Sequence, residues 1–138
     1  MRVGGAAYGA PEFWERDTVP RRHEEADFQR ALVAFLQIAL PHDACYFHTP
    51  NGGPSKKANA RLKGLGVIAG VPDLCVIHRG RALFLELKAK RGVVSLAQRN
   101  LHKLLVHCGA VVMTVRSVPE AEAALREASV PLRASVAA

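Results

Sequence analysis

Two carboxylates and one lysine lie within a pair of short apolar segments near the middle of the chain. Asp73 directly precedes Leu74–Ile77, while Glu86 and Lys88 stand at the end of Ala82–Leu87 and just beyond it. Apolar runs of this length, separated by His-Arg-Gly-Arg, predict a β-hairpin. Carboxylate oxygens bind magnesium or manganese, and a lysine beside them can orient or activate a water. The set therefore has the chemistry for hydrolysis of a phosphate ester.

The predicted hairpin determines which of these side chains meet. With the turn centred between Arg79 and Gly80, a pair that leaves the turn type open, opposed residue numbers sum to 159, and Asp73 faces Glu86. Opposed Cβ atoms lie about 4.5 to 5.5 Å apart, and two ionised carboxylates at about 5 Å repel by roughly 3 kcal/mol at an effective dielectric of about 20. Strand alternation places Lys88 on the same face. A cation between the carboxylates would offset their repulsion.

A plainer interpretation makes Glu86 and Lys88 an exposed salt bridge along one strand, with Asp73 merely opening its neighbour. The opposition of Asp73, the apolar surroundings of both strands and a glycine-rich basic segment upstream all weigh against it. The residues alone leave the two interpretations about equal.

The upstream segment, Thr49–Pro72, predicts a long loop with a helical turn near Ala58–Lys63. Loops of this length commonly contact a substrate, and this one contains no acidic residue, so its cations and amides suit phosphate groups. A merely solvated loop is an equal alternative for any single lysine. The candidate nucleic-acid-binding residues are Asn51, Lys56, Lys57, Arg61 and Lys63.

Hydrophobic periodicity predicts the elements around this hairpin. The predicted order is a helix from about Glu24 to Pro41, a strand Ala44–Phe47, the hairpin, a helix capped by Ser95 and Gln98 that ends at Gly109, a buried strand Ala110–Val115, and a helix from Ser117 to about Ala128. Strand, helix and strand from Ala82 to Val115 should cross over right-handedly and give a parallel pair. The fold class is therefore α/β, with one mixed sheet flanked by helices.

Composition narrows the range of functions. A chain of 138 residues with 49% apolar content forms one domain, and its net charge of +7 favours polyanionic partners. No apolar run approaches the ~18 residues of a membrane span and the first residues lack a signal peptide, so a cytoplasmic protein without membrane contact is expected. Residues 1–20 predict a flexible arm that Phe13 and Trp14 could anchor, 21–130 the domain, and 131–138 a tail.

Cysteine and histidine spacing gives no sign of a zinc site. The three scattered cysteines lie in apolar segments and predict reduced core residues: Cys45, Cys75 and Cys108. His102 and His107, five residues apart, do not share a face of their predicted helix, whose apolar face is expected to carry Leu101, Leu104, Leu105 and Cys108.

Several short blocks occur in an order that resembles the VRR-NUC (virus-type replication-repair nuclease) domain of the PD-(D/E)xK nucleases, from about Glu24 to Ala124. These blocks are Glu25-x-x-Phe28-Gln29, His48-x-x-Asn51-Gly52, Gly66-x-x-x-Gly70-Val71-Pro72-Asp73, Glu86-Leu87-Lys88, Ser95-x-x-Gln98 and Gly109-Ala110. Each block is weak alone, and the ordered set is specific. The resemblance implies a restriction-endonuclease-like αβββαβ core, the same element order as the periodicity predicts.

The resemblance also implies roles for single residues. Asp73, Glu86 and the carbonyl of Leu87 would hold Mg²⁺ or Mn²⁺, with Lys88 as the catalytic lysine and Gln98 as a further site residue. Periodicity cannot choose between Glu24 and Glu25 for an acid on the first helix. The family spacing favours Glu25, as a group that holds a metal-bound water or a second metal; a helix-start carboxylate favoured by the dipole is the plainer role.

The activity that the resemblance implies is structure-directed cleavage of DNA, of the branched or Holliday-junction type, in replication, repair or recombination. Stand-alone domains of this family are associated with phages and bacteria and with homodimers. Two alternatives remain: a catalytically silent nucleic-acid-binding module of the same fold, and a protein-interaction domain with an incidental acidic pair. Metal-dependent nicking would separate the first from the nuclease, and salt-dependent DNA affinity would exclude the second.

Overall fold

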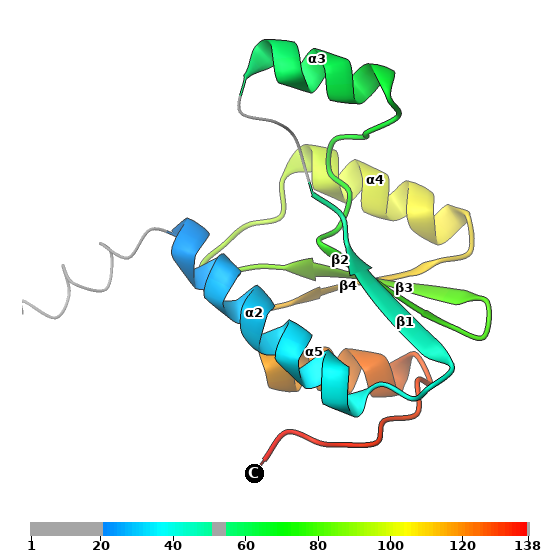
Figure 1. Cartoon of the computed structure of the whole chain (residues 1–138). Helices are drawn as coiled ribbons and strands as arrows, with labels where there is room; N and C mark the ends of the chain where they lie inside the picture. Colours follow the sequence, from blue (N-terminus) through cyan, green and yellow to red (C-terminus); the bar gives the residue numbers. More distant parts are fainter. Residues whose placement is uncertain (1–20, 51–54, 138) are drawn as a thin grey trace, which may run out of the picture.

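A four-stranded mixed sheet forms the centre of the structure, a computed structural model that describes residues 21–50 and 55–137 (Figure 1). The strands lie in the order β1 (Ala44–His48), β2 (Leu74–His78), β3 (Arg81–Leu87) and β4 (Val111–Val115). The first two pairings are antiparallel and β3 is parallel to β4. The predicted α/β class, the order of elements along the chain and the parallel pairing of the last two strands are confirmed.

Helices cover both faces of this sheet. Helices α2 (Arg21–Ala39) and α5 (Val118–Glu127) pack against one face and against each other, and α4 (Leu96–His107) covers the other face (Figure 1). α3 (Lys56–Gly64) stands away from the sheet. The described residues contain no helix that is long and apolar enough to cross a membrane.

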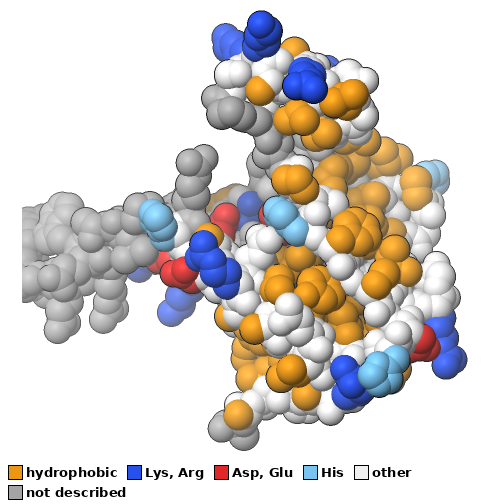
Figure 2. All heavy atoms as spheres, viewed as in Figure 1, with side chains coloured by type: hydrophobic (Ala, Val, Ile, Leu, Met, Phe, Trp, Pro, Cys, Tyr) orange, Lys and Arg blue, Asp and Glu red, His pale blue; other side chains and the backbone are white. Residues whose placement is uncertain are grey.

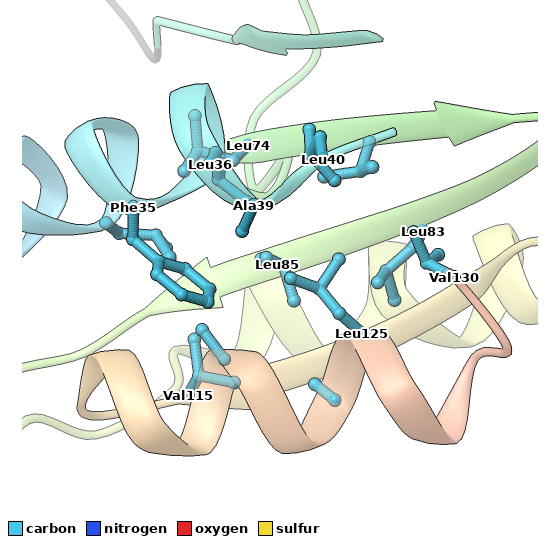
Figure 3. Close-up of a cluster of buried hydrophobic side chains, with 14 of the residues drawn as sticks. Phe35, Leu36, Ala39, Leu40, Leu74, Leu83, Leu85, Val115, Leu125 and Val130 are labelled. Carbon is cyan, nitrogen blue, oxygen red and sulfur yellow. The ribbon is translucent and has the colours of Figure 1, made fainter. Parts of the chain in front are cut away.

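The hydrophobic core lies between the sheet and the α2–α5 layer (Figure 3). Leu83, Leu85 and Leu87 alternate along β3 and point into this core, where each is at most 3% exposed. Leu32 and Leu36 of α2 and Leu125 of α5 are buried in the same cluster, and this packing holds β3 against the α2–α5 layer. Because β3 alternates, the intervening Glu86 must face α4 on the other side of the sheet.

The predicted helical turn near Ala58–Lys63 is a full helix. Ser55 caps α3 by accepting a hydrogen bond from the backbone N–H of Ala58 at 3.1 Å. None of its residues is buried, so apolar periodicity gives little sign of it.

The apolar face predicted for α4 is wrong in part. Leu101 is 9% exposed and Leu105 is half-buried, but Leu104 is 54% exposed and Cys108 is exposed. The helix is rotated so that Gln98 and His102, which share a face with Leu101 and Leu105 at helical spacing, turn toward Glu86. The inward face of α4 carries these polar side chains, which is why the apolar pattern predicted the wrong face.

The prediction of three buried cysteines is wrong for two of them. Cys75, in the central strand β2, is buried, and burial raises the pKa of its thiol. Cys45 is exposed because it lies on the edge strand β1, and Cys108 is exposed because it caps α4 beyond the buried turns. All three are free thiols.

The C-terminal residues of the described chain lie against the core. Arg133 donates from its backbone N–H to the carbonyl of Ala39 and from Nε to the carbonyl of Leu40, both at 2.7 Å. Leu132 and Val136 pack on the core cluster. The arm predicted for residues 1–20, with Phe13 and Trp14, lies outside the described residues.

Candidate active site

The predicted hairpin register is present in the structure. Leu74 pairs with Leu85 and His78 with Arg81, so opposed numbers sum to 159. Arg79 and Gly80 form the turn with φ of 49° and 77°, and two positive φ values are the signature of a type I′ turn. Asp73 lies one residue before the first pair and so stands beside Glu86, and the two carboxyl groups meet at the end of β3.

Asp73 is held by the backbone of both neighbouring strands. Its Oδ2 accepts a hydrogen bond from the N–H of Leu87 at 2.8 Å. Its carbonyl accepts from the N–H of Thr49 at 3.0 Å and lies 2.7 Å from Nδ1 of His48, both at the end of β1. Burial raises the pKa of Asp73, and the charge of Glu25 raises it further, against the lowering effects of the Leu87 N–H, Lys88 and His48.

Glu86 is 1% exposed, and each of its carboxylate oxygens has a side-chain partner. Gln98 Nε2 donates to Oε1 at 2.8 Å, and His102 Nε2 lies 3.3 Å from Oε2. Burial and the neighbouring Asp73 raise the pKa of Glu86 to about 7, although Lys88 acts in the opposite direction. A nearby cation would stabilise the ionised form of this buried carboxyl group, because it would compensate for the lost hydration.

Lys88 is drawn into the same buried cluster. Its Nζ lies 3.4 Å from Glu86 Oε1, and its side chain is 11% exposed. The salt bridge of the plainer interpretation therefore exists, but it is buried beside a second carboxylate instead of lying on an exposed strand face. Charges in such a place persist only when paired or when bound to an ion.

Gln98 combines two roles at the start of α4. Its Oε1 accepts from the backbone N–H of Ser95 at 2.8 Å, while Ser95 Oγ accepts from the backbone N–H of Gln98 at 3.2 Å, which completes the predicted capping box. The amide Nε2 remains directed at Glu86. Capping therefore fixes the side chain that orients the carboxylate.

Gly70 brings the segment before Asp73 against the same helix end. It has a φ of 85°, and a Cβ atom at this position would lie 2.7 Å from the carbonyl oxygen of Ala97 and 2.9 Å from the backbone nitrogen of Gln98. Backbone therefore touches backbone between the Asp73 side and the Gln98 side of the site. Only glycine permits this approach at that φ.

Glu25, the acid left undecided against Glu24, reaches the turn that follows β3. It is half-buried whereas Glu24 is exposed, and its Oε1 accepts from the N–H of Ala89 at 3.3 Å. Arg116 holds the same turn with Nη1, which donates to the carbonyls of Ala89 at 2.8 Å and Gly92 at 2.7 Å. Glu25 thus lies near Asp73 while bracing the turn after Lys88.

The predicted phosphate-binding residues that the structure describes lie on α3 and not in the carboxylate cluster. Lys56, Lys57, Arg61 and Lys63 are all exposed on α3. Figure 2 shows lysine and arginine side chains gathered on this helix, above a surface with many hydrophobic side chains. Asn51 lies outside the described residues.

Sequence reasoning missed His102 and the role of His48. His102 follows Gln98 by four residues, the spacing that puts two side chains on one helix face, and this was the available signal. Burial lowers the pKa of His102, as does Lys88, while Asp73 raises it. His48 belongs to the His48-x-x-Asn51-Gly52 block, but its contact with the Asp73 carbonyl depends on the β1–β2 pairing.

A solved structure of a VRR_NUC domain protein matches this chain with a TM-score of 0.55 and 18% identity, over 74% of this chain and 84% of the other. The chain has the fold of a VRR-NUC domain. At this identity the likeness establishes the fold, and the chemistry rests on the residues just described. No family model and no curated protein matches the sequence.

The donor set of this VRR-NUC fold fits a hard divalent cation that keeps most of its water. Within residues 21–50 and 55–137, no group of three or more histidine, cysteine, aspartate or glutamate side chains is arranged to hold a metal ion by itself, so water and phosphate would have to complete the coordination. Asp73 and Glu86 provide oxygen ligands whose pKa values are raised first by burial and then by a neighbouring carboxylate, Glu25 for Asp73 and Asp73 for Glu86. Magnesium and manganese bind through one or two carboxylates, with water and phosphate in the other positions.

Proposed function

We propose that this chain is a Mg²⁺- or Mn²⁺-dependent DNA endonuclease that hydrolyses phosphodiester bonds. The observation that carries the proposal is the meeting of the half-buried Asp73 and the buried Glu86, both with raised pKa values, beside Lys88 at the end of β3. A cation at this point would activate water and offset charge on the phosphate. The VRR-NUC fold supports this reading of the site.

Each side chain of the site has a distinct task in this proposal. Asp73 and Glu86, with the Leu87 carbonyl, hold the cation, and Gln98 keeps the Glu86 carboxylate in place. Lys88 Nζ, within the same cluster, orients or deprotonates the water that attacks phosphorus. The P–O bond to the leaving oxygen then breaks, and that oxygen takes up a proton. Glu25 braces the turn and can hold a further water or a second metal ion.

DNA binding is assigned to the exposed cations of α3. Phosphate contacts of this kind position a duplex without reading its sequence, which fits recognition of branched or junction DNA by shape. Two symmetric cuts in a four-way junction require two sites, so a two-fold homodimer is part of the proposal.

The test is incubation of the protein with labelled linear, flap and four-way DNA, with each metal separately and with a chelator. The expected result is metal-dependent products from the parent, formed much more slowly by Lys88→Ala, with preference for branched substrates. Sedimentation analysis of the parent, alone and with a junction, tests the dimer. DNA binding with no cleavage in the presence of either metal would contradict the proposed nuclease activity.

That last outcome is the result expected for a catalytically silent module. One observation favours this second candidate: Gln98, His102 and Lys88 already satisfy Glu86 within the protein. Among the described residues, no buried side-chain nitrogen or oxygen lacks a hydrogen-bond partner. The raised pKa of Glu86 argues the other way, because an internally satisfied carboxylate would ionise readily.

A further inference from the structure

Helix α4 contacts both carboxylate oxygens of Glu86. Gln98 Nε2 approaches Oε1 at 2.8 Å, and His102 Nε2, one helical turn further along α4, approaches Oε2 at 3.3 Å. The side chain of His102 is 15% exposed, and that of Glu86 is 1% exposed. The contact between His102 and the carboxylate is therefore largely shielded from solvent.

The two contacts together do what one contact cannot. The terminal torsion of a glutamate is broad, so a donor on a single oxygen leaves the carboxylate free to rotate about its last bond. Donors on both oxygens fix the carboxylate plane. Lys88 does not replace the second donor, because its Nζ lies 3.4 Å from Oε1, the oxygen that Gln98 already contacts.

The ring nitrogen of His102 that carries the proton follows from its partner, Glu86. A carboxylate that binds a cation is ionised and accepts hydrogen bonds only, so Nε2 of His102 must carry the proton in that state. The geometry is then an N–H donor fixed on a rigid helix, whose start is secured by the capping box of Ser95 and Gln98.

We propose that His102 is a positioning residue that fixes the Glu86 carboxylate for a divalent cation. The inference rests on the proposed function for the cation itself, and it adds a residue that touches neither phosphate nor metal. Residues that orient metal ligands in this way commonly change metal affinity by about 10- to 100-fold when they are replaced.

The test is calorimetric titration of Mn²⁺ into the folded, DNA-free protein at neutral pH. His102→Leu keeps approximate volume and removes the donor, and His102→Gln restores a donor. His102→Leu should weaken Mn²⁺ binding by about tenfold or more, and His102→Gln should bind within about threefold of the parent. His107→Leu, an exposed histidine of the same helix, should bind like the parent.

Two further variants separate the possible failures. If Asp73→Asn loses Mn²⁺ binding while both His102 variants bind like the parent, the positioning role is overturned and the metal site stands. Equal loss in His102→Leu and His102→Gln, with rescue by neither, also overturns it, because packing alone would then be the cause. A parent protein that binds no Mn²⁺ overturns the proposed function and this inference with it.

Discussion

The carboxylate cluster and helix α3 meet opposite physical requirements within one small domain. Asp73, Glu86 and Lys88 are fixed by strands on two sides and by α4, whereas α3 carries its cations on a helix with no buried residue. Chemistry at a scissile bond needs groups held to within a fraction of an ångström. Attraction of a phosphate backbone needs only charge at the right distance.

This contrast predicts that substitutions in the cluster change a rate, a pH dependence or a metal affinity, while substitutions on α3 change DNA affinity alone. The largest effect is expected at Lys88. Lys88→Ala should slow single-turnover cleavage of a saturated substrate by roughly 10²- to 10⁴-fold, because the water loses its orienting or activating group. Saturation removes binding and product release from the measured rate.

Stability does not discriminate between the readings of Lys88, because the pair with Glu86 is buried and its loss destabilises the fold in either case. Lys88→Arg provides the sharper comparison, since arginine keeps the charge and cannot readily lose a proton. A slow Lys88→Arg indicates proton transfer and a fast one indicates charge stabilisation. Near-parent rates in both variants would return Lys88 to a purely structural role.

The second prediction concerns the pH dependence of stability without metal. Glu86 has a pKa of about 7 in the fold against an ordinary value of 4.5, so the folded state retains a proton that the unfolded chain releases. The free energy of unfolding should therefore fall by about 3 kcal/mol as the pH rises from 4.5 to 7. Glu86→Gln should lack this fall. Urea unfolding of both proteins in chelator tests it, and parallel pH profiles would contradict it.

The third prediction uses two glycines of one segment, Gly70 and Gly66. Both have positive φ, but an added Cβ would meet the backbone of α4 at Gly70 and nothing within 4 Å at Gly66. Gly66→Ala should therefore cost about 1 kcal/mol from backbone strain alone. Gly70→Ala should cost about 2 kcal/mol or more and also weaken Mn²⁺ binding, because α4 carries Gln98. Equal effects of both variants on stability and on Mn²⁺ binding would show that this contact does not position the site.

The smallest effect is expected on α3. Lys56→Ala combined with Lys57→Ala should weaken DNA binding and reduce the slope of log affinity against log salt by about one to two, with the single-turnover rate at saturation unchanged. Arg30→Ala with Arg81→Ala removes two exposed cations elsewhere and should leave the slope nearly intact. An unchanged slope in the α3 variant would make this helix a bystander.

Local patterns in the sequence predicted much of this arrangement. The hairpin register follows from turn position and strand alternation, which depend on neighbours along the chain, and the Ser95–Gln98 capping box is likewise local. The element order followed from periodicity. The family resemblance then predicted the fold that the solved VRR_NUC structure shares.

Features set by tertiary packing were not predictable in the same way. The orientation of α4 depends on its polar contacts with Glu86, so apolar spacing placed Leu104 and Cys108 inward when both are exposed. The difference between Glu24 and Glu25 depends on where the turn after β3 comes to lie against α2. His102 was overlooked because its partner lies 16 residues earlier, on a strand.

In the proposed function, Asp73 and Glu86 together hold the cation used for cleavage. The rate of DNA cleavage by Asp73→Asn with Mg²⁺ and with Mn²⁺, measured on protein whose folding is verified by thermal melting, tests this directly. The substitution removes one of two neighbouring carboxylates that repel each other, so the metal-free variant should melt at or above the parent temperature. It should gain little or no stability from added metal, and cleavage should be abolished. Retained cleavage with either metal would show that Asp73 is not a ligand of the catalytic cation.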